Sequence, residues 1–262
     1  MHILGNTLVE IAEQKVGIIK ENSETIFALS EDKDVNDKIK ETCMQRKNKL
    51  HIVQKQDINN YSYNQEFQKF DYKSYKDIVI NLKGEKQLLN SSICIECIEI
   101  LREKSYNIPD DALRIGLKTV IHRGRFETIN QNPLMIFDGA HNKPAIENFR
   151  KSLEMYYKKQ NRVFIISILK TKDYKMILQQ LLEDEKSVFI FTDGNDKERY
   201  VAKEELLETA KKYTNNEKLY VQDLQKSIDF VKENYTNDVI FFVGSFYIYG
   251  TVTKKLEEYR KH

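Results

Sequence analysis

The sequence predicts an α/β protein whose second half forms a mostly parallel sheet with helices on both faces. In that half, apolar strand-like runs alternate with amphipathic helical runs, which is the pattern of consecutive β-α units. The runs "RVFIISIL" and "DVIFFVG" are apolar throughout, as is typical of strands buried on both faces. The expected strands are 134–138, 163–169, 187–192, 218–221 and 238–243, and the expected helices are 142–158, 171–184, 201–213, 223–234 and 246–260.

The first half begins with a short helical pattern, "NTLVEIAEQKVGIIK". Asn6 or Thr7 is the expected N-cap, and Gly17 is expected to end the helix. The apolar face of this helix is expected to carry Leu8, Ile11 and Ala12.

The rest of the first half mixes elements less regularly. A helix with Val35, Ile39 and Cys43 on one face lies between two strand-like runs. Residues 55–76 are polar and tyrosine-rich without a clear period, which favours a hairpin and a loop. The expected elements are strands at 25–29, 49–54 and 77–82, a long helix to about Lys104, and a short helix from Pro109 to about Val120.

The composition is that of an ordinary globular protein. The 262 residues carry 42 basic and 40 acidic side chains, and the formal net charge is +2. The two signs alternate along most predicted helices, so the sequence predicts neither a nucleic-acid nor a membrane partner. No apolar run approaches the roughly 18–20 residues of a membrane span, and the N-terminus lacks a signal-peptide pattern. We expect a cytoplasmic protein.

Two of the three cysteines, Cys94 and Cys97, form a C-x-x-C inside a helical pattern with isoleucines on both sides. A zinc site would need two further ligands, and no second pair of Cys or His accompanies them. We therefore predict buried helix cysteines in place of a metal or redox motif, which together with Cys43 fits a reducing compartment.

We place a domain boundary near residue 122, which gives a first part at 1–121 and a second at 122–262. In a parallel sheet covered by helices, ligands bind beyond the carboxyl ends of the strands. Two short segments, "DGAHN" (138–142) and "GSFY" (244–247), fall at that edge of the predicted sheet.

The segment "IFDGAHN" can be a ligand site or a simple helix cap. Asp138 can accept hydrogen bonds from ribose hydroxyls, and His141 lies by the start of a helix, where phosphate is favoured. In the alternative, Asp138 or Asn142 merely caps the helix, with Pro144 in its first turn.

Three other segments carry weaker signals. In "HRGRFETI", Arg123 and Arg125 suit phosphate or carboxylate, although ordinary surface arginines are more common. Lys15 ends an apolar helix face, where a lysine can become a neutral, usable amine or can extend its ammonium to water. Gln87 and Asn90 follow a strand and a Gly84 turn, which suits adenine recognition or plain capping.

No phosphate loop of the Walker A type and no G-x-G-x-x-G motif occurs in the sequence. The order of five segments nevertheless resembles the folylpolyglutamate synthase/dihydrofolate synthase family, which belongs with the Mur-type, ADP-forming acid–amino acid ligases. The resemblance covers nearly the whole chain, and the first and fourth segments are the most specific. The segments are "LGNTLVEIAEQKVGIIK", "LKGEKQLLNSSI", "IHRGRFETI", "IFDGAHN" and "VGSFYIYG".

This resemblance implies an architecture and a reaction. Residues 1–121 would be the C-terminal part of a Mur-ligase-type ATPase domain, and residues 122–262 a Rossmann-like ligase domain. The family uses ATP and magnesium to convert a carboxylate of dihydropteroate or a folate into an acyl phosphate, which the amine of L-glutamate attacks.

The resemblance also implies roles for individual residues. Lys15 matches a lysine that carbon dioxide carbamylates and that then helps to hold magnesium. ATP contacts are implied for Arg125, Asp138 and His141, and adenine contacts for Gln87 and Asn90, while Ser245 lies in a motif whose role the sequence does not define.

The sequence departs from the family pattern in several places. The phosphate loop and other metal ligands lie upstream in the family, and His2 does not replace the family's metal-binding histidine because it is out of register. The usual Lys-Ala-Gly is Lys15-Val16-Gly17 here, and Lys86 stands where the family has histidine.

We therefore expect a fragment with little or no ligase activity alone, association with the missing N-terminal segment, and exposed apolar surface where missing strands of the N-terminal part would pair. Glutamate-dependent ADP release by the purified chain would contradict the expected inactivity. Two alternatives stay open: a non-catalytic nucleotide- or partner-binding module, and a related Mur-type ligase acting on another acid.

Overall fold

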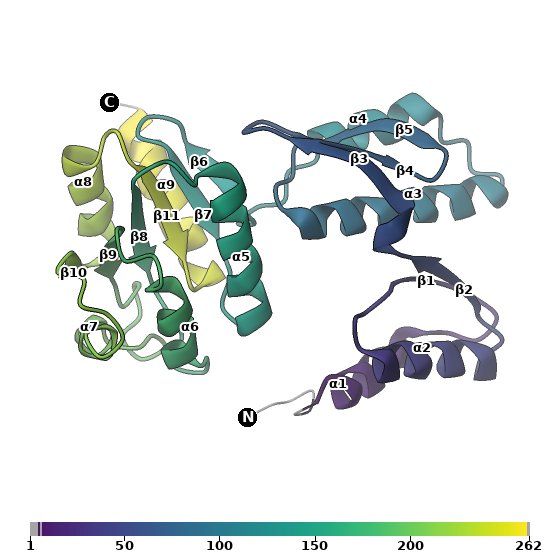
Figure 1. Cartoon of the computed structure of the whole chain (residues 1–262), viewed down its shortest axis with the longest axis horizontal. Coiled ribbons are helices and arrows are strands. Elements are labelled where there is room, and N and C mark those ends of the chain that lie inside the picture. The colour runs from purple at the N-terminus through teal and green to yellow at the C-terminus, as the bar shows by residue number, and fades with distance from the viewer. Residues whose placement is uncertain (1–4, 6, 261–262) are drawn as a thin grey trace. The chain divides into compact units, whose positions relative to one another are not determined.

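The computed structural model describes Gly5 and residues 7–260 and divides the chain into two compact units. The first unit comprises Met1–Asn81 and Glu85–Val120, and the second comprises Leu82–Gly84 and Ile121–His262. Figure 1 labels the elements of both units, which are described separately below.

The first helix of the first unit, α1 (Leu8–Lys15), begins with a capping box. The Thr7 hydroxyl accepts a hydrogen bond from the Glu10 amide, and the Glu10 carboxylate accepts one from the Thr7 amide. Thr7 is thus the N-cap, while the alternative, Asn6, lies outside the described residues, as does His2. Helix α1 gives way at Val16 to a 3-10 turn that contains Gly17. The predicted apolar face is wrong at Leu8, which is 60% exposed.

Two parallel strands and a helix follow α1. Strands β1 (Glu24–Ala28) and β2 (Lys49–Val53) form a two-stranded sheet, with α2 (Lys33–Gln45) between them in the chain. The buried apolar cluster beside this sheet consists of Val16, Ile19, Ile39 and Cys43. Leu8, Ile18 and Met44 are exposed apolar side chains of this unit.

The polar stretch after β2 is more regular than predicted. A three-stranded antiparallel meander, β3 (Ile58–Tyr63), β4 (Gln68–Tyr72) and β5 (Tyr75–Ile80), replaces the expected hairpin and loop. Helices α3 (Glu85–Glu103) and α4 (Asp110–Thr119) cover it, and Pro109 is the N-cap of α4. Their shared core contains Val53, Phe70, Tyr72, Ile78, Ile80, Leu88, Ile95, Leu113 and Leu117.

The second unit is built on a six-stranded sheet in the order β10-β9-β8-β11-β7-β6. The pairs from β10 to β7 are parallel, as predicted, while β6 runs antiparallel to β7 at the edge. No strand was predicted at β6, because its four residues are mostly polar. The strands are β6 (Glu127–Asn130), β7 (Met135–Asp138), β8 (Arg162–Ile166), β9 (Val188–Phe191), β10 (Leu219–Val221) and β11 (Val239–Val243).

Helices cover both faces of this sheet, which confirms the predicted fold class. One buried cluster joins α5, α6 and α7 to one face, and a second cluster joins α8 and α9 to the other. Figure 1 shows β11 between β8 and β7, although it is the last strand in the chain. The helices are α5 (Lys143–Tyr156), α6 (Tyr174–Leu181), α7 (Lys203–Ala210), α8 (Leu224–Asn234) and α9 (Tyr249–Arg260).

The strand order creates a switch point between β8 and β11. After β8 the chain passes to α6 on one face, and after β11 it passes to α9 on the opposite face. The two chain segments therefore diverge beyond the carboxyl ends of adjacent strands, which is where open α/β sheets form ligand crevices.

Candidate functional site

A pocket of about 660 Å³ lies at the switch point of the second unit. Its lining comes from segments that follow β7, β8 and β11 and from the loop before α7. The volume is within the range of about 300–1,000 Å³ that is usual for small-molecule sites. The lining residues are His141, Leu169, Lys170, Thr171, Lys172, Glu198, Arg199, Ser245, Phe246 and Tyr247.

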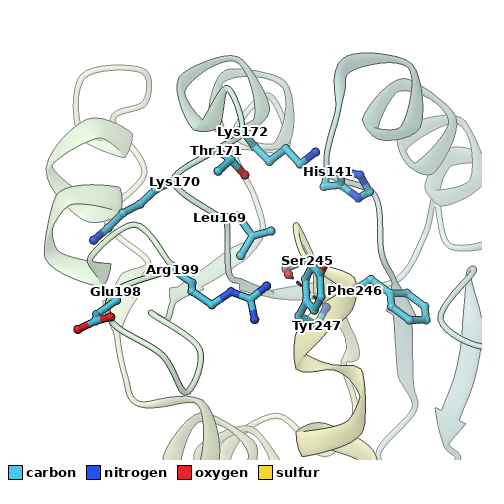
Figure 2. Close-up of a pocket in the computed structure, with 10 residues that line it drawn as sticks. All are labelled: His141, Leu169, Lys170, Thr171, Lys172, Glu198, Arg199, Ser245, Phe246 and Tyr247. Atoms are coloured by element: carbon cyan, nitrogen blue, oxygen red, sulfur yellow. Dashed lines mark hydrogen bonds between the residues drawn. The ribbon is translucent and has the colours of Figure 1, made fainter. Parts of the chain in front are cut away.

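Positive charge exceeds negative charge in this pocket. Its lining holds Lys170, Lys172 and Arg199, against one acid, Glu198. Figure 2 shows Arg199 pointing toward Tyr247 and Lys172 pointing toward His141, whereas Lys170 and Glu198 point outward. Within the described part of the chain, none of these three basic groups forms an ion pair, so the pocket suits an anionic ligand.

Arg199 is held in place by an aromatic ring. Its guanidinium carbon lies 4.5 Å from the centroid of the Tyr247 ring, which is a cation–π contact. The loop that carries Arg199 is fixed to the segment after β8 by a bridge between Leu169 and Tyr200. A guanidinium that is stacked but not ion-paired keeps its planar fork of donors for a carboxylate or phosphate.

Asp138, at the end of β7, ties two loops together. Its Oδ1 accepts a hydrogen bond from the Ala140 amide at 2.8 Å, and its Oδ2 accepts one from the Phe126 amide at 3.0 Å. Burial raises the pKa of Asp138 to about 6, although both amides and the charge of Arg125 favour the ionised form. The sequence suggested a helix cap or a ligand contact, and the structure adds a third role, the attachment of the 122–126 turn.

Arg125 lies in that same turn, next to Asp138. The side chain of Arg125 is half-buried, and its charge acts on the Asp138 carboxyl. Arg123, in contrast, is engaged by Glu127, which accepts hydrogen bonds from the Arg123 guanidinium and the Gly124 amide, both at 2.7 Å. Arg123 is thus held in an ion pair with Glu127, whereas Arg125 forms no ion pair within the described residues.

His141 follows the end of β7 and lines the pocket. Its Nδ1 lies 2.7 Å from the Gly139 carbonyl oxygen, which favours the tautomer with the proton on Nδ1. The Nε2 atom is then available to a ligand. The cap of α5 is Asn142, whose side chain accepts a hydrogen bond from the Ala145 amide, so the helix does not need Asp138 or His141 for capping.

Ser245 is buried and forms hydrogen bonds within and beyond the turn that follows β11. Its hydroxyl accepts a hydrogen bond from the Tyr247 amide at 3.3 Å and lies 3.2 Å from the Tyr200 hydroxyl. This joins the Tyr247 turn to the loop of Arg199. The two aromatic partners were not predicted from sequence.

The comparisons with known proteins agree with this geometry. A family model described as "Dihydrofolate synthetase, C-terminal domain" matches residues 122–255, just over half of the chain. The chain belongs to the dihydrofolate synthase/folylpolyglutamate synthase family. Two curated relatives are each 27% identical: a dihydrofolate synthase/folylpolyglutamate synthase of Bacillus subtilis, over 98% of this chain, and a folylpolyglutamate synthase of Lacticaseibacillus casei, over 72%.

Solved structures of the family share the fold. The folylpolyglutamate synthase of Thermotoga maritima matches 97% of this chain with a TM-score of 0.80 and 23% identity. The enzyme of Mycobacterium tuberculosis, solved with ADP and AMPPCP, also matches with a TM-score of 0.80, at 19% identity. The chain spans only 60% of the length of the Bacillus subtilis relative and 59% of the Thermotoga maritima chain.

Of the residues that the family resemblance selects, Lys15, Gln87 and Asn90 lie in the first unit. Asn90 donates a hydrogen bond to the Gln87 side chain at 3.0 Å, so the two amides are neighbours on α3. Of the two settings that the sequence left open for Lys15, the structure shows the solvent-exposed one. Helix α1 buries Ala12 and is followed by buried Val16, whereas Lys15 is exposed.

The prediction that Cys94 and Cys97 are buried is wrong. Cys43 is buried, but Cys94 and Cys97 are exposed. The buried residues of helix α3 are Leu88, Ser91, Ser92, Ile95 and Ile100, and neither cysteine is among them.

Neither a metal cluster nor a membrane span is found in the part of the chain that the structure describes. No three His, Cys, Asp or Glu side chains within Gly5 and 7–260 are grouped so that they could hold a metal ion. These residues therefore do not by themselves fit the magnesium that the family resemblance implies. No described helix is long and apolar enough to cross a membrane.

Proposed function

We propose that this chain supplies the C-terminal part of a ligase that joins L-glutamate to dihydropteroate or a folate at the expense of ATP. ATP phosphorylates a carboxylate of the acceptor, the glutamate amine attacks the resulting acyl phosphate, and phosphate leaves as the amide forms. Membership of the family supports this proposal, as do relatives whose names specify these activities. In domain terms, residues 122–262 would be the ligase domain, and residues 1–121 the end of the ATPase domain.

The observation that carries the proposal is the cationic pocket beside the Asp138 loop. Beside it we assign Arg125, Asp138 and His141 to the ATP side, because they cluster at the end of β7. We assign Arg199 and Lys172 to the carboxylates of L-glutamate, because both are free of ion pairs within the described residues and line the adjoining pocket. A dicarboxylate with one amine matches two separate cationic groups.

The first unit would contribute adenine contacts through Gln87 and Asn90. Lys15 is retained as the candidate for carbamylation, but its exposure means that apolar surroundings would have to come from outside the described residues. The same holds for the magnesium ligands. We therefore propose that catalysis also needs the portion of the family that this chain does not span, which the sequence resemblance places N-terminal to it.

A binding experiment tests the assigned residues on the chain as it exists. Titration of the purified chain with ATP and with L-glutamate, followed by NMR, should shift amides at the ends of β7, β8 and β11. Arg125→Ala should weaken ATP binding, and Arg199→Ala should weaken glutamate binding, each by roughly 10-fold or more for a lost charged hydrogen bond. Arg150→Ala, which removes an arginine ion-paired with Glu183 on the same unit, is the matched control and should change neither affinity.

A second experiment tests the reaction. The chain alone should release no ADP in response to glutamate, whereas the chain mixed with an N-terminal polypeptide from the Bacillus subtilis relative should do so. Loss of that activity in Arg125→Ala, with Arg150→Ala retaining it, would support the ligase. Binding without ADP release in the mixture would favour the second candidate, a non-catalytic binding module.

A further inference from the structure

The ring of Phe246 lies against two glycines that flank the proposed ATP-contacting residues. A Cβ on Gly124 would lie 2.5 Å from Phe246 Cε2, and a Cβ on Gly139 would lie 3.0 Å from Phe246 Cδ2. The Phe246 ring can thus pack against both residues only because glycine has no side chain. Gly124 directly precedes Arg125, and Gly139 directly follows Asp138.

The two glycine segments are also bonded to each other beneath the ring. The Gly139 amide donates a hydrogen bond to the Gly124 carbonyl at 2.8 Å, and the Phe126 amide donates one to Asp138. Phe246 therefore packs on a junction of two loops, one of which carries Arg125 and the other Asp138 and His141. Figure 2 shows the ring of Phe246 pointing away from Arg199 and Tyr247.

A second aromatic ring supports Phe246. Tyr249 stacks on it with ring centroids 5.8 Å apart and an interplanar angle of 6°. The Tyr249 hydroxyl donates to Glu127 at 3.2 Å, and Glu127 also accepts from the Gly124 amide. The 122–126 turn is consequently held by a hydrogen bond from its backbone to Glu127 and by packing against the Phe246–Tyr249 stack.

We propose that Phe246 is a positioning residue that fixes the Arg125 turn against the Asp138 strand end and so sets the affinity for a nucleoside triphosphate. The ligand part of this inference rests on the proposed function. Phe246 acts through its packing on the two glycine segments, because a smaller side chain would leave the junction without its cover and let Arg125 depart from its place. This assigns a role to the "GSFY" segment that the sequence left undefined.

The loop junction itself can be tested without a ligand. In Phe246→Ala and in the milder Phe246→Leu, amide hydrogen exchange at Gly139 and Phe126 should accelerate, by roughly 10-fold in the alanine variant, as is typical of lost coupling between contacting groups. Phe230→Ala is the control, since Phe230 is a half-buried phenylalanine of α8 that packs on Tyr220 and Tyr235. Unchanged exchange at both amides in a folded Phe246 variant would overturn the proposal.

A substitution on the opposite side of the contact gives an independent test. Gly139→Ala should disturb the junction because its Cβ meets the ring, and the backbone at Gly139 is not in the left-handed region that alanine avoids. The double variant Gly139→Ala/Phe246→Ala should then be less perturbed, at the Phe126 amide, than the sum of the single variants. Strict additivity would argue against a direct packing role.

The nucleotide readout separates this inference from the proposed function. ATP dissociation constants should rise in Phe246→Ala, and Arg125→Ala should add little further loss in that background. If the wild-type chain binds no ATP while exchange at Gly139 still accelerates in the variant, the ATP contacts assigned to this chain fail and the positioning of the loops stands. If ATP binds equally well to wild type and Phe246→Ala, the positioning role toward the nucleotide is refuted.

Discussion

The two units of this chain differ most in how completely their parallel strands are buried. In the second unit, every residue of β8 and β11 is buried, with helices on both faces. In the first unit, every residue of β1 is only half-buried, and β2 is its sole neighbour among the described strands. Parallel strands depend on cover from both sides, and two-stranded sheets have little stability of their own. The second unit should therefore be the more stable, and the first should open locally.

Removal of one core ring from each sheet should produce the largest difference. Phe241→Ala in fully buried β11 should cost about 3–5 kcal/mol, because the ring contacts Phe149, Phe164 and Tyr157. Phe27→Ala in half-buried β1 should cost clearly less. Urea unfolding followed by amide exchange in each unit measures both costs, and equal values would contradict the comparison.

Acid should affect the two units in opposite directions. Burial raises the pKa of Asp138 from 3.8 to about 6, so its favourable contribution is present below pH 4 and is lost as the pH rises to 6. At about 1.4 kcal/mol per pKa unit, the change is at most about 3 kcal/mol. The second unit of the wild-type chain should thus gain stability as the pH falls from 6 to 4. The Asp138→Asn variant should not show this gain.

The corresponding acid of the first unit has the reverse shift. The Asp77 amide, with Asn60 and Lys76, lowers the pKa of Asp71 from 3.8 to about 2. Its contribution is present above pH 4 and disappears as the pH falls toward 2. Unfolding measured by circular dichroism from pH 2 to pH 7 should therefore show the first unit melting earlier in acid, and a parallel pH response of the two units would refute this.

Glycine replacements should give a smaller contrast. Gly244, after β11, has a φ of +103°, and a Cβ there would lie 2.6 Å from the Ser167 carbonyl oxygen. Gly244→Ala should cost about 1–3 kcal/mol. Gly17→Ala, where nothing lies within 4 Å of the added atom, should be neutral or slightly stabilising. Thermal unfolding of the two variants compares them, and a neutral Gly244→Ala would be the contrary result.

Thiol labelling should report the smallest energetic effect. Cys94→Ser and Cys97→Ser should change stability by no more than about 0.5 kcal/mol, since both side chains are exposed. In that double variant, buried Cys43 is the remaining thiol, and its labelling rate measures the opening of the first unit. Labelling that is as slow as global unfolding would show that the first unit does not open separately.

The sequence predicts the elements of the second unit well because its strands are continuous apolar runs. It misses β6, a short polar edge strand, because this strand is defined by its pairing with β7 and not by a local sequence pattern. In the first unit it places Leu8, Cys94 and Cys97 in the interior, because periodicity shows that a helix has an apolar side without showing how much surface is available to cover it.

The candidate site follows the same division. Asp138, His141 and Ser245 can be placed together from sequence, because the carboxyl ends of parallel strands share one edge. Lys170 and Lys172 follow β8 at that edge, so the same reasoning could have selected them. Arg199 could not be found in this way, since a bridge between distant segments brings its loop to the pocket.

The position of β11 has a consequence for how the second unit is made. This strand lies between β7 and β8, yet it is the last of the sheet to leave the ribosome. Until residue 243 has emerged, the facing edges of β7 and β8 have no partner and can pair with other nascent chains. Synthesis of the final helix thus overlaps with the period in which the growing polypeptide most needs protection by chaperones.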